Sequence, residues 1–351
     1  MKALVLSGGS GTRLRPFSYS MPKQLIPIAN KPVLAHVLEN IRSIGVTEIG
    51  VIVAGDGAPI REAFGDGTRF GVRLTYIPQE TPSGLAACVT LAGAFLGDDD
   101  FVMYLGDNIL PEGIEEIAER FAADRPAAQV VVHKVADPTA FGVVELDPEG
   151  RVTRLVEKPR QPRSDLALIG VYFFTSAIHE AVAAIEPSAR GELEITDAVQ
   201  WLLATGGEVR ATQYEGYWKD TGRVDDVLDC NRKLLDELLP SVTGTVDAHS
   251  VIKGQVVVEQ GACIVRSTIE GPTIIGAGTR VEDSHVGPYT SIGEGCVLRD
   301  AQLAGSIALA GASVIGVTGL HGSLIGRSAT VGRAARHRLV VGDHTSVEVA
   351  A

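Results

Sequence analysis

Residues 3–16 read ALVLSGGSGTRLRP, and this stretch decides the fold of the first half of the chain. Ala3–Leu6 is a short apolar run, typical of a buried strand, and a glycine-rich turn follows it at once. Such glycines let the backbone approach a ligand closely and turn its N–H groups toward an anion. Position 14 is Leu14, so the third glycine of a Rossmann fingerprint is missing, and no Gly-Lys-Ser/Thr closes a P-loop. We therefore predict an anion-binding turn of another kind; the alternative is a plain turn with a surface arginine.

Helical and strand patterns alternate over the residues that follow, up to Pro240. Continuous apolar strands between helices are typical of a mostly parallel sheet covered on both faces. The sequence thus predicts a Rossmann-like α/β domain over residues 1–240. The expected helices are 33–44, 85–95, 114–121, 194–203 and 223–239, and the expected strands are 3–6, 49–53, 101–105 and 129–135.

After Pro240 the helical signal ends and apolar residues recur every six positions. A six-residue period is typical of a parallel β-helix with three flat faces, in which each coil buries the aliphatic side chains of the next. A β-sandwich, the alternative, would show alternation with period two. We predict a hexapeptide β-helix over residues 241–351. The predicted inward positions are Val251, Val257, Cys263, Ile269, Ile275, Val281, Val286, Ile292, Val297, Leu303, Leu309, Ile315, Ile325, Val331, Val341 and Val347.

Composition narrows the class of protein further. The 351 residues are 45% hydrophobic and carry a net charge of −12, which disfavours general nucleic-acid binding. No apolar run reaches the length of a membrane span, and the first residues do not read as a cleavable signal. The four cysteines are far apart and form no CxxC pair, so we expect free thiols and a cytoplasmic protein.

Several charged residues are candidates for binding a phosphorylated ligand. Arg13 and Lys23 flank the glycine-rich turn and could reach phosphates. Asp107 follows the strand 101–105, where open α/β sheets place ligands, and hard Mg²⁺ prefers one or two carboxylates. The alternative for Asp107 is a turn residue. Lys158 is a further candidate for binding a phosphate, and its alternative is a solvated lysine at a strand end.

The order of motifs resembles that of the sugar-1-phosphate nucleotidylyltransferases, and most closely the glucose-1-phosphate thymidylyltransferases. The resemblance covers essentially the whole chain, and the added β-helix is similar to the long form often found in biosynthesis of deoxysugar-containing antibiotics. Its motifs are GGSGTRLRP (8–16), PKQLIPIANKP (22–32), GDGTRFG (65–71), PSGLA (82–86), YLGDN (104–108), FGVVE (141–145), EKP (157–159), GVYFF (170–174), RGELEITD (190–197) and WKDTG (218–222).

The resemblance implies a Mg²⁺-dependent reaction of dTTP with glucose 1-phosphate, and a left-handed β-helix. It implies metal binding by Asp107 and Asp220, and catalytic roles for Arg13, Lys23 and Lys158. Gln79 and Gly84 would read the pyrimidine edge, which selects thymine or uracil. The remaining implied contacts are Leu6, Gly8, Gly9, Gly11 and Thr12 with the nucleotide, and Asn108, Gly142, Glu157, Lys158 and Tyr172 with the sugar.

Three alternatives remain open. The enzyme could use UTP, another triphosphate or a different sugar or cyclitol phosphate. The β-helix could transfer acyl groups, with His285 or His321 as the base, or the chain could be a silent subunit that binds sugar nucleotides. Arg223 stands where the family usually has a small hydroxyl residue, so the pocket beside Asp220 could differ. We expect the β-helix to serve assembly into a homo-oligomer.

Overall fold

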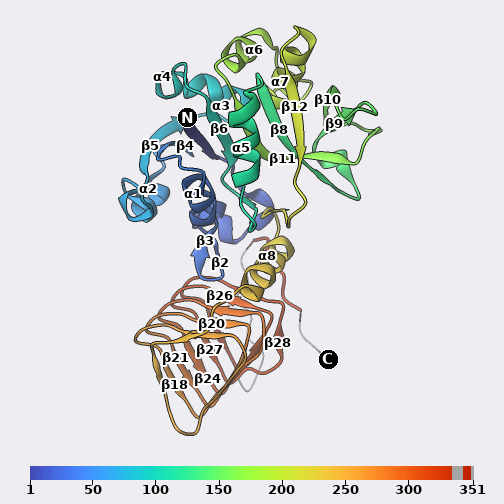
Figure 1. Ribbon diagram of the computed structural model, residues 1–351. Coiled ribbons are helices and arrows are strands. Elements are labelled where there is room, and N and C mark those ends of the chain that lie inside the picture. Colours follow the sequence, from blue (N-terminus) through green and yellow to red (C-terminus); the bar gives the residue numbers. More distant parts are fainter. Residues whose placement is uncertain (334–342, 349–351) are drawn as a thin grey trace. The chain divides into compact units, whose positions relative to one another are not determined.

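The computed structural model describes residues 1–333 and 343–348 (Figure 1). Residue contacts divide the chain into two compact units. The first unit consists of residues 1–10 and 33–220, and the second of residues 11–32 and 221–351. The domain boundary at residue 240 stays a prediction, because the division into contact units falls at other positions.

The first unit is built on a mixed nine-stranded sheet with the strand order β10-β9-β11-β6-β1-β4-β5. Strand β8 also pairs with β11, and β12 pairs with β8. Strands β6, β1, β4 and β5 are parallel, whereas β11 runs antiparallel to β6 and β8. The α/β prediction is confirmed, and the antiparallel half is what the sequence pattern did not reveal. The strands are β1 (Lys2–Ser7), β4 (Glu48–Ala54), β5 (Arg73–Gln79), β6 (Phe101–Leu105), β8 (Ala128–Lys134), β9 (Gly142–Leu146), β10 (Val152–Glu157), β11 (Leu166–Phe174) and β12 (Val209–Gln213).

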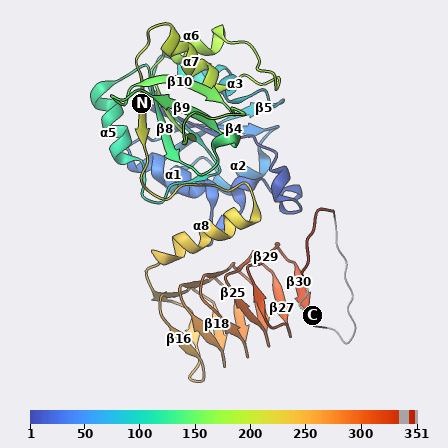
Figure 2. The same cartoon turned by 90° about the vertical axis from the view of Figure 1, so that its right-hand side faces the viewer.

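Helices cover both faces of this sheet (Figure 2). On one face α5 touches the sheet through a hydrogen bond from Gln129 to the carbonyl of Ile117 and through the Phe121–Phe173 ring pair. On the other face α3, α6 and α7 join the sheet in one apolar cluster. The helices are α1 (Val33–Ser43), α2 (Ala58–Phe64), α3 (Leu85–Leu91), α4 (Gly93–Leu96), α5 (Glu115–Asp124), α6 (Ile178–Ala184) and α7 (Ile195–Ala204).

The expected helix over 85–95 is two helices instead of one. Helix α3 ends at Leu91 and α4 begins at Gly93. Between them Ala92 has φ −84° and ψ 0°, outside the helical region. Glycine is a poor helix former, so a continuous helix through Gly93 would be less stable than one with another residue there.

The second unit contains the β-helix, whose short strands form three parallel sheets (Figures 1 and 2). The prediction of a left-handed β-helix of hexapeptide repeats is confirmed. The first sheet has β14 (Ser241–Val242), β17 (Val256–Val258), β20 (Thr273–Ile275), β23 (Thr290–Ile292), β26 (Ile307–Ala308) and β29 (Leu324–Ile325). The second has β15 (Thr245–Val246), β18 (Cys263–Val265), β21 (Arg280–Glu282), β24 (Val297–Arg299), β27 (Ser313–Ile315) and β30 (Thr330–Gly332). The third has β16 (Val251–Lys253), β19 (Thr268–Glu270), β22 (His285–Val286), β25 (Gln302–Ala304) and β28 (Leu320–His321).

The predicted register was wrong by one residue in part of the β-helix. Val251 is 45% exposed and Ile315 is 41% exposed, whereas the neighbouring Ile252 and Val314 pack in the core. The same shift puts Ile264, not Cys263, and Leu298, not Val297, in the core. Val257 lies between the buried Val256 and Val258, Val347 is exposed, and Val341 lies outside the described residues. The predicted positions Ile269, Ile275, Val281, Val286, Ile292, Leu303, Leu309 and Ile325 are buried.

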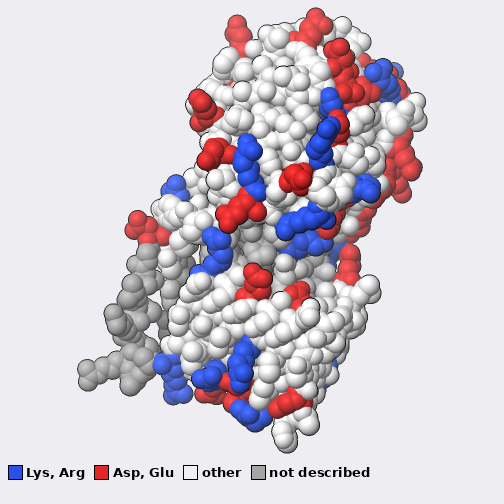
Figure 3. Space-filling view, turned by 90° about the vertical axis from the view of Figure 1, so that its left-hand side faces the viewer, with Lys and Arg blue, Asp and Glu red and all other residues white. Residues whose placement is uncertain are grey.

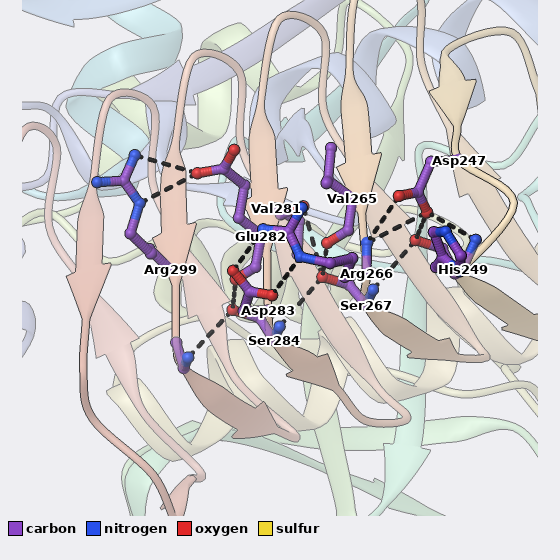
Figure 4. A network of polar contacts seen from close by, with 12 residues as sticks. Asp247, His249, Val265, Arg266, Ser267, Val281, Glu282, Asp283, Ser284 and Arg299 are labelled. Carbon is purple, nitrogen blue, oxygen red and sulfur yellow. Dashed lines mark hydrogen bonds and ion pairs between the residues drawn. The ribbon is translucent and has the colours of Figure 1, made fainter.

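A hydrogen-bonded ladder runs along one corner of the β-helix (Figure 4). The Oγ of Ser267 accepts a hydrogen bond from the N–H of Ser284 at 3.1 Å, and the Oγ of Ser284 accepts one from Ala301 at 3.0 Å. Each bond joins residues 17 apart, which is the length of one coil. Beside the ladder, Arg266 and Asp283 form a two-pronged ion pair at 2.7 Å. The corner therefore fixes the stacking of successive coils.

The remaining elements of the second unit are the 3-10 helices η1 (Thr12–Leu14), η2 (Phe17–Tyr19) and η3 (Lys23–Leu25), the hairpin β2 (Pro27–Ile28) and β3 (Lys31–Pro32), and α8 (Val224–Asp236). None of the helices in the described residues combines the length and apolarity that a membrane span requires. Basic and acidic side chains are interspersed on the face of each unit that Figure 3 shows.

Candidate active site

The carboxyl ends of four parallel strands in the first unit meet at one edge of the sheet. Strand β1 lies between β4 and β6, and its Leu6 pairs with Ile52 and Leu105. This is a topological switch point, where open α/β sheets bind ligands. The glycine-rich turn follows β1, Asp107 follows β6, and Gln79 ends β5 beside β4. The topology thus brings these predicted site residues of the first unit to the same edge.

Gly8 and Gln79 are in close contact at this edge. A Cβ on Gly8 would lie 2.7 Å from Oε1 of Gln79, so a larger residue at this position would displace that amide. The Gln79 amide donates to Sγ of Cys88 at 3.4 Å, and this thiol donates to the carbonyl of Gly84 at 3.6 Å. Burial raises the pKa of the Cys88 thiol to about 11, so it stays protonated. The two residues predicted to read a base are therefore linked through Cys88.

Gly84 also joins two of the sequence motifs. Its φ is +100°, and a Cβ there would lie 2.3 Å from the carbonyl oxygen of Leu193. The N–H of Leu193 donates to Ser83 at 2.8 Å, and the N–H of Ala86 donates to Leu193 at 3.0 Å. Segment 82–86 is thus paired with segment 190–197, and glycine is required where the two backbones touch.

The two predicted metal ligands lie on a short antiparallel pair, β7 (Asn108–Ile109) and β13 (Lys219–Asp220). Asp220 is directly opposite Asn108 in this pair. Asn108 donates its amide to Oδ1 of Asp107 at 3.0 Å and accepts from the indole N–H of Trp218 at 2.6 Å. Both Asp107 and Asn108 are buried. The pairing therefore brings together two carboxylates that are far apart in the sequence.

The predicted sugar-binding residues gather at the end of the β9–β10 pair, where Glu157 is opposite Gly142. The Oε2 of Glu157 accepts from Thr196 at 2.7 Å, and its Oε1 lies 3.2 Å from Nζ of Lys158 and 3.5 Å from Arg190. A Cβ on Gly142 would lie 3.1 Å from Oε2 of Glu157. Glu157, Lys158 and Gly142 therefore form one cluster with α7 and the segment before it.

Burial alters the electrostatics around this cluster. It raises the pKa of Glu194, whose carboxylate is bound to Ser188 and Arg190 at 3.0 Å each, and that of Asp197. Tyr172 is buried and stacks on Phe174, with ring centroids 5.9 Å apart. Burial, and to a smaller extent the charge of Glu157, raises the pKa of the Tyr172 phenol. Tyr172 is thus a neutral packing group beside Glu157.

The other predicted phosphate-binding residues belong to the second unit. Gly11 has φ +59° and precedes η1, and a Cβ on it would lie 3.4 Å from Cβ of Lys23. Thr12 and Arg13 are exposed on η1, which is held by the fully buried Leu14. Gly11 and Lys23 are therefore in contact although they are separated in the sequence by η1 and η2.

The two histidines of the β-helix lie in separate places. His285 places Nε2 3.2 Å from Oε2 of Glu270, which is also paired with Lys253 at 3.0 Å. His321 lines a hollow with Arg232, Asp236 and Tyr289. These contacts do not test acyl transfer, which stays an alternative.

Sequence reasoning missed three residues that support the site. Cys88 was considered only as a cysteine outside any zinc pattern, and Arg190 and Thr196 only as parts of a motif. Arg190 contacts Glu157, Glu192 and Glu194, and Thr196 donates to Glu157. The sequence signals for these contacts were Glu157 in the EKP motif and the charged residues of the RGELEITD motif. Neither signal specifies which residues pair.

Comparisons with known proteins agree with this geometry. A family model described as nucleotidyl transferase matches residues 2–237. The chain therefore belongs to the nucleotidyl transferase family, and it is an enzyme of the nucleotidyltransferase class. Enzymes of this family act on nucleoside triphosphates and sugar phosphates with the help of a divalent metal.

Relatives within the family match over the full length. The chain is 52% identical over 354 residues to a glucose-1-phosphate thymidylyltransferase of Streptomyces antibioticus, with 99% of both chains covered. A protein of the same name from Streptomyces griseus is 52% identical over 353 residues, again with 99% of both covered. Among solved structures, a putative glucose-1-phosphate thymidylyltransferase from Bacillus anthracis in complex with a sucrose is 33% identical with a TM-score of 0.62, covering 66% of this chain and 94% of that chain.

Proposed function

We propose that the protein is a Mg²⁺-dependent glucose-1-phosphate thymidylyltransferase, which converts dTTP and glucose 1-phosphate into dTDP-glucose and pyrophosphate. The observation that carries the proposal is that Gly8, Gln79 and Asp107 lie at one sheet edge, at or just after the carboxyl ends of strands β1, β5 and β6. The full-length relatives, which bear this name, support the same choice of substrates.

The reaction in this proposal is an in-line displacement at the α-phosphorus of dTTP. An oxygen of the sugar phosphate forms a bond to that phosphorus while the bond to the pyrophosphate oxygen breaks. The attacking oxygen is already anionic, so no protein nucleophile or general base is required. Positioning and neutralisation of charge supply the rate enhancement.

Three cations have distinct roles in this proposal. Arg13 stabilises the charge that develops on the β- and γ-phosphates, and Lys23 binds the α-phosphate. Lys158 binds the phosphate of the sugar. The ion pair of Lys158 with Glu157 at 3.2 Å supports its role, because it orients the ammonium group next to the predicted sugar contacts.

Asp107 and Asp220 fit a magnesium ion by the chemistry of their donors. Carboxylates are hard oxygen ligands, and Mg²⁺ usually takes one or two of them together with phosphate oxygens and water. Within the described ranges there is no group of three or more His, Cys, Asp or Glu that could hold a metal, which suits an ion bound partly by substrate. Bound there, Mg²⁺ would neutralise triphosphate charge and fix its geometry.

The remaining residues in the proposal select the substrates. Gln79 and Gly84 bind the edge of thymine, while Leu6, Gly8, Gly9, Gly11 and Thr12 contribute contacts with the nucleotide. Asn108, Gly142, Glu157 and Tyr172 surround the sugar. The link from Gln79 through Cys88 to Gly84 supports the first set, since it fixes both groups relative to each other.

The proposal is tested by pyrophosphate release with Mg²⁺ across a grid of substrates. The triphosphates are dTTP, UTP, ATP, GTP and CTP, and the sugars are glucose, galactose, mannose and glucosamine 1-phosphates. We expect the highest kcat/KM with dTTP and glucose 1-phosphate, and loss of turnover with a chelator. A peak at another pair would change the substrates and keep the mechanism, whereas a blank grid contradicts the glucose assignment.

We also propose that the protein acts in the cytoplasm as a homo-oligomer. All four cysteines are free thiols, and three of them are buried, which suits a reducing compartment. Light scattering coupled to size exclusion measures the oligomeric state; a monomeric mass contradicts the proposed assembly.

A further inference from the structure

The segment that carries Arg13 and Lys23 ends in a strained hairpin. The turn between β2 and β3 consists of Ala29 and Asn30, with φ of +49° and +59°. Two-residue hairpin turns of this type favour Asn and Gly, whereas alanine with positive φ costs about 1 kcal/mol. Strain of this kind persists where the surroundings hold the backbone in place.

Asn231 of helix α8 holds this turn. Its Oδ1 accepts hydrogen bonds from the N–H of Ala29 at 2.9 Å and from the Oγ of Ser291 at 2.7 Å. Its Nδ2 donates to the carbonyl of Tyr289 at 3.3 Å. Asn231 is 1% exposed and Ser291 is fully buried. The amide is therefore a satisfied buried hub between the hairpin, α8 and strand β23 of the β-helix, and such hubs are costly to break.

Two further contacts tie the same segment to the β-helix. The side chain of Asn30 donates to the carbonyl of Ile292 at 2.7 Å. Near the middle of the segment, Arg327 donates to the carbonyl of Ser20 at 3.0 Å, next to a groove of about 560 Å³ shared by Phe17, Met21 and Leu324. The 11–32 segment is thus fastened to strand β23 and just after strand β29.

We propose that the β-helix takes part in nucleotidyl transfer by holding the 11–32 segment in the conformation in which Arg13 and Lys23 bind the triphosphate. Asn30, Asn231, Ser291 and Arg327 are then positioning residues, which act through the backbone of that segment. The inference rests on the proposed function, because that function gives Arg13 and Lys23 their ligand. A loop ordered before the ligand arrives loses less entropy when it binds, and it aligns its cations more closely.

The variant N30G tests this inference most directly, because glycine keeps the positive φ and removes only the amide bond to Ile292. We expect the KM for dTTP to rise about fivefold to tenfold, as for the loss of one member of a coupled network. The KM for glucose 1-phosphate stays within about twofold of its wild-type value. R327A, which removes the other tie, shifts the same constant in the same direction.

S267A is the matched control. It removes a buried serine hydroxyl from the β-helix ladder, but Ser267 bonds only to coil residues in the described contacts (Figure 4). Hydrogen exchange of residues 12–25 should rise in N30G and R327A and stay unchanged in S267A. Unchanged exchange and KM in both variants overturn the inference, and so does an equal rise of KM in S267A.

The proposed function is checked separately in the same experiment. Wild-type protein that turns over no combination of triphosphate and sugar phosphate contradicts the proposed function. The hydrogen-exchange comparison still tests whether the ties hold segment 12–25, so that the two failures are distinguished.

Discussion

The two units use carboxylates in opposite ways. In the first unit Glu194 has a side chain only 5% exposed, and burial raises its pKa despite its contact with Arg190. In the second unit Asp283 lies at the surface of the β-helix and Glu282 is partly covered by its arginine partners, and hydrogen bonds from Arg266 and Arg280, respectively, lower the pKa values of these two carboxyls. Burial therefore dominates in one unit and pairing in the other.

The two sets of carboxylates differ in what their environment implies: buried charges are typical of a binding site, and paired charges support the structure of the β-helix. Charges are expensive to bury, and the first unit accepts that cost at Glu194 and Asp107, which lie in the region where we propose that substrates bind. Ion pairs in which at least one partner is exposed contribute little free energy, yet the pairs Arg266–Asp283 and Arg299–Glu282 each join successive coils and support their register. Changes at the buried carboxylates of the first unit should therefore affect turnover, and changes at the paired carboxylates of the β-helix should affect only local stability.

The largest effect is expected for D107N. The substitution keeps the oxygen that accepts from Asn108 and removes the negative charge, so the fold is preserved while the metal ligand is weakened. We expect turnover to fall by about a thousandfold, because a bound metal contributes several kcal/mol to the stabilisation of the transition state. Steady-state pyrophosphate release and the thermal midpoint measure the two quantities.

D124N is the control for this change. Asp124 is an exposed aspartate that pairs with Arg210 at the end of α5. Its conversion to asparagine should leave turnover unchanged. Full activity of D107N would show that Asp107 is a turn residue and that the metal is held elsewhere.

Sequence reasoning succeeded where one local pattern determines the structure. The strand predicted over residues 3–6 is present as β1, and the glycine turn follows it at the carboxyl edge of the parallel strands, where open α/β sheets bind ligands. The β-helix was also predictable, since a six-residue period admits few folds. Its register failed at Val251 and Cys263 because the neighbouring Ile252 and Ile264 are equally apolar, and because the coils that begin at these two positions have 17 residues, one short of three hexapeptides.

Other features depend on contacts between distant segments and left no local signal. The antiparallel strand β11 looks apolar throughout, as a parallel strand would. The Thr196–Glu157 bond joins residues 39 apart, and the Asn231–Ala29 bond joins residues 202 apart. The role of Asn231 could not be predicted, because a lone asparagine in a helix is usually solvent-exposed.

An intermediate effect is expected for G8A. The new methyl group would meet Oε1 of Gln79 at 2.7 Å, and the amide, as the end of a side chain, can move aside at little cost to stability. The displaced amide no longer reads the base, so kcat/KM with dTTP should fall by about tenfold to a hundredfold. The preference for dTTP over CTP should fall with it, which competition assays measure.

G93A is the matched control for this substitution. Gly93 begins α4, and a Cβ there meets nothing within 4 Å. Activity should be unchanged, and the free energy of unfolding should rise slightly because alanine favours the helix. Equal base preference in G8A and the wild type would remove Gln79 from the pyrimidine contact.

The smallest effect is expected from pH, and its sign should differ between the units. A carboxylate with a lowered pKa stabilises the folded state above its unfolded pKa and loses this contribution as pH falls through the folded value. Glu282 and Asp283 should therefore weaken the protection of β21 and β24 below about pH 4.5. Glu194 and Asp197 have raised pKa values, so protonation relieves a penalty in the first unit as pH falls toward their unfolded values.

Hydrogen-exchange protection, corrected for the intrinsic rate at each pH, measures this difference directly. Between pH 7 and pH 3 the protection of β21 and β24 should fall relative to that of α7. The variant E282Q should flatten the change in the β-helix, and E194Q should flatten the change in α7. Because Glu282 pairs with both Arg280 and Arg299, its loss should also make the β-helix less sensitive to salt. If protection changed with pH in the same way in α7 and in β21 and β24, burial and ion pairing would not explain a difference between the two sets of carboxylates.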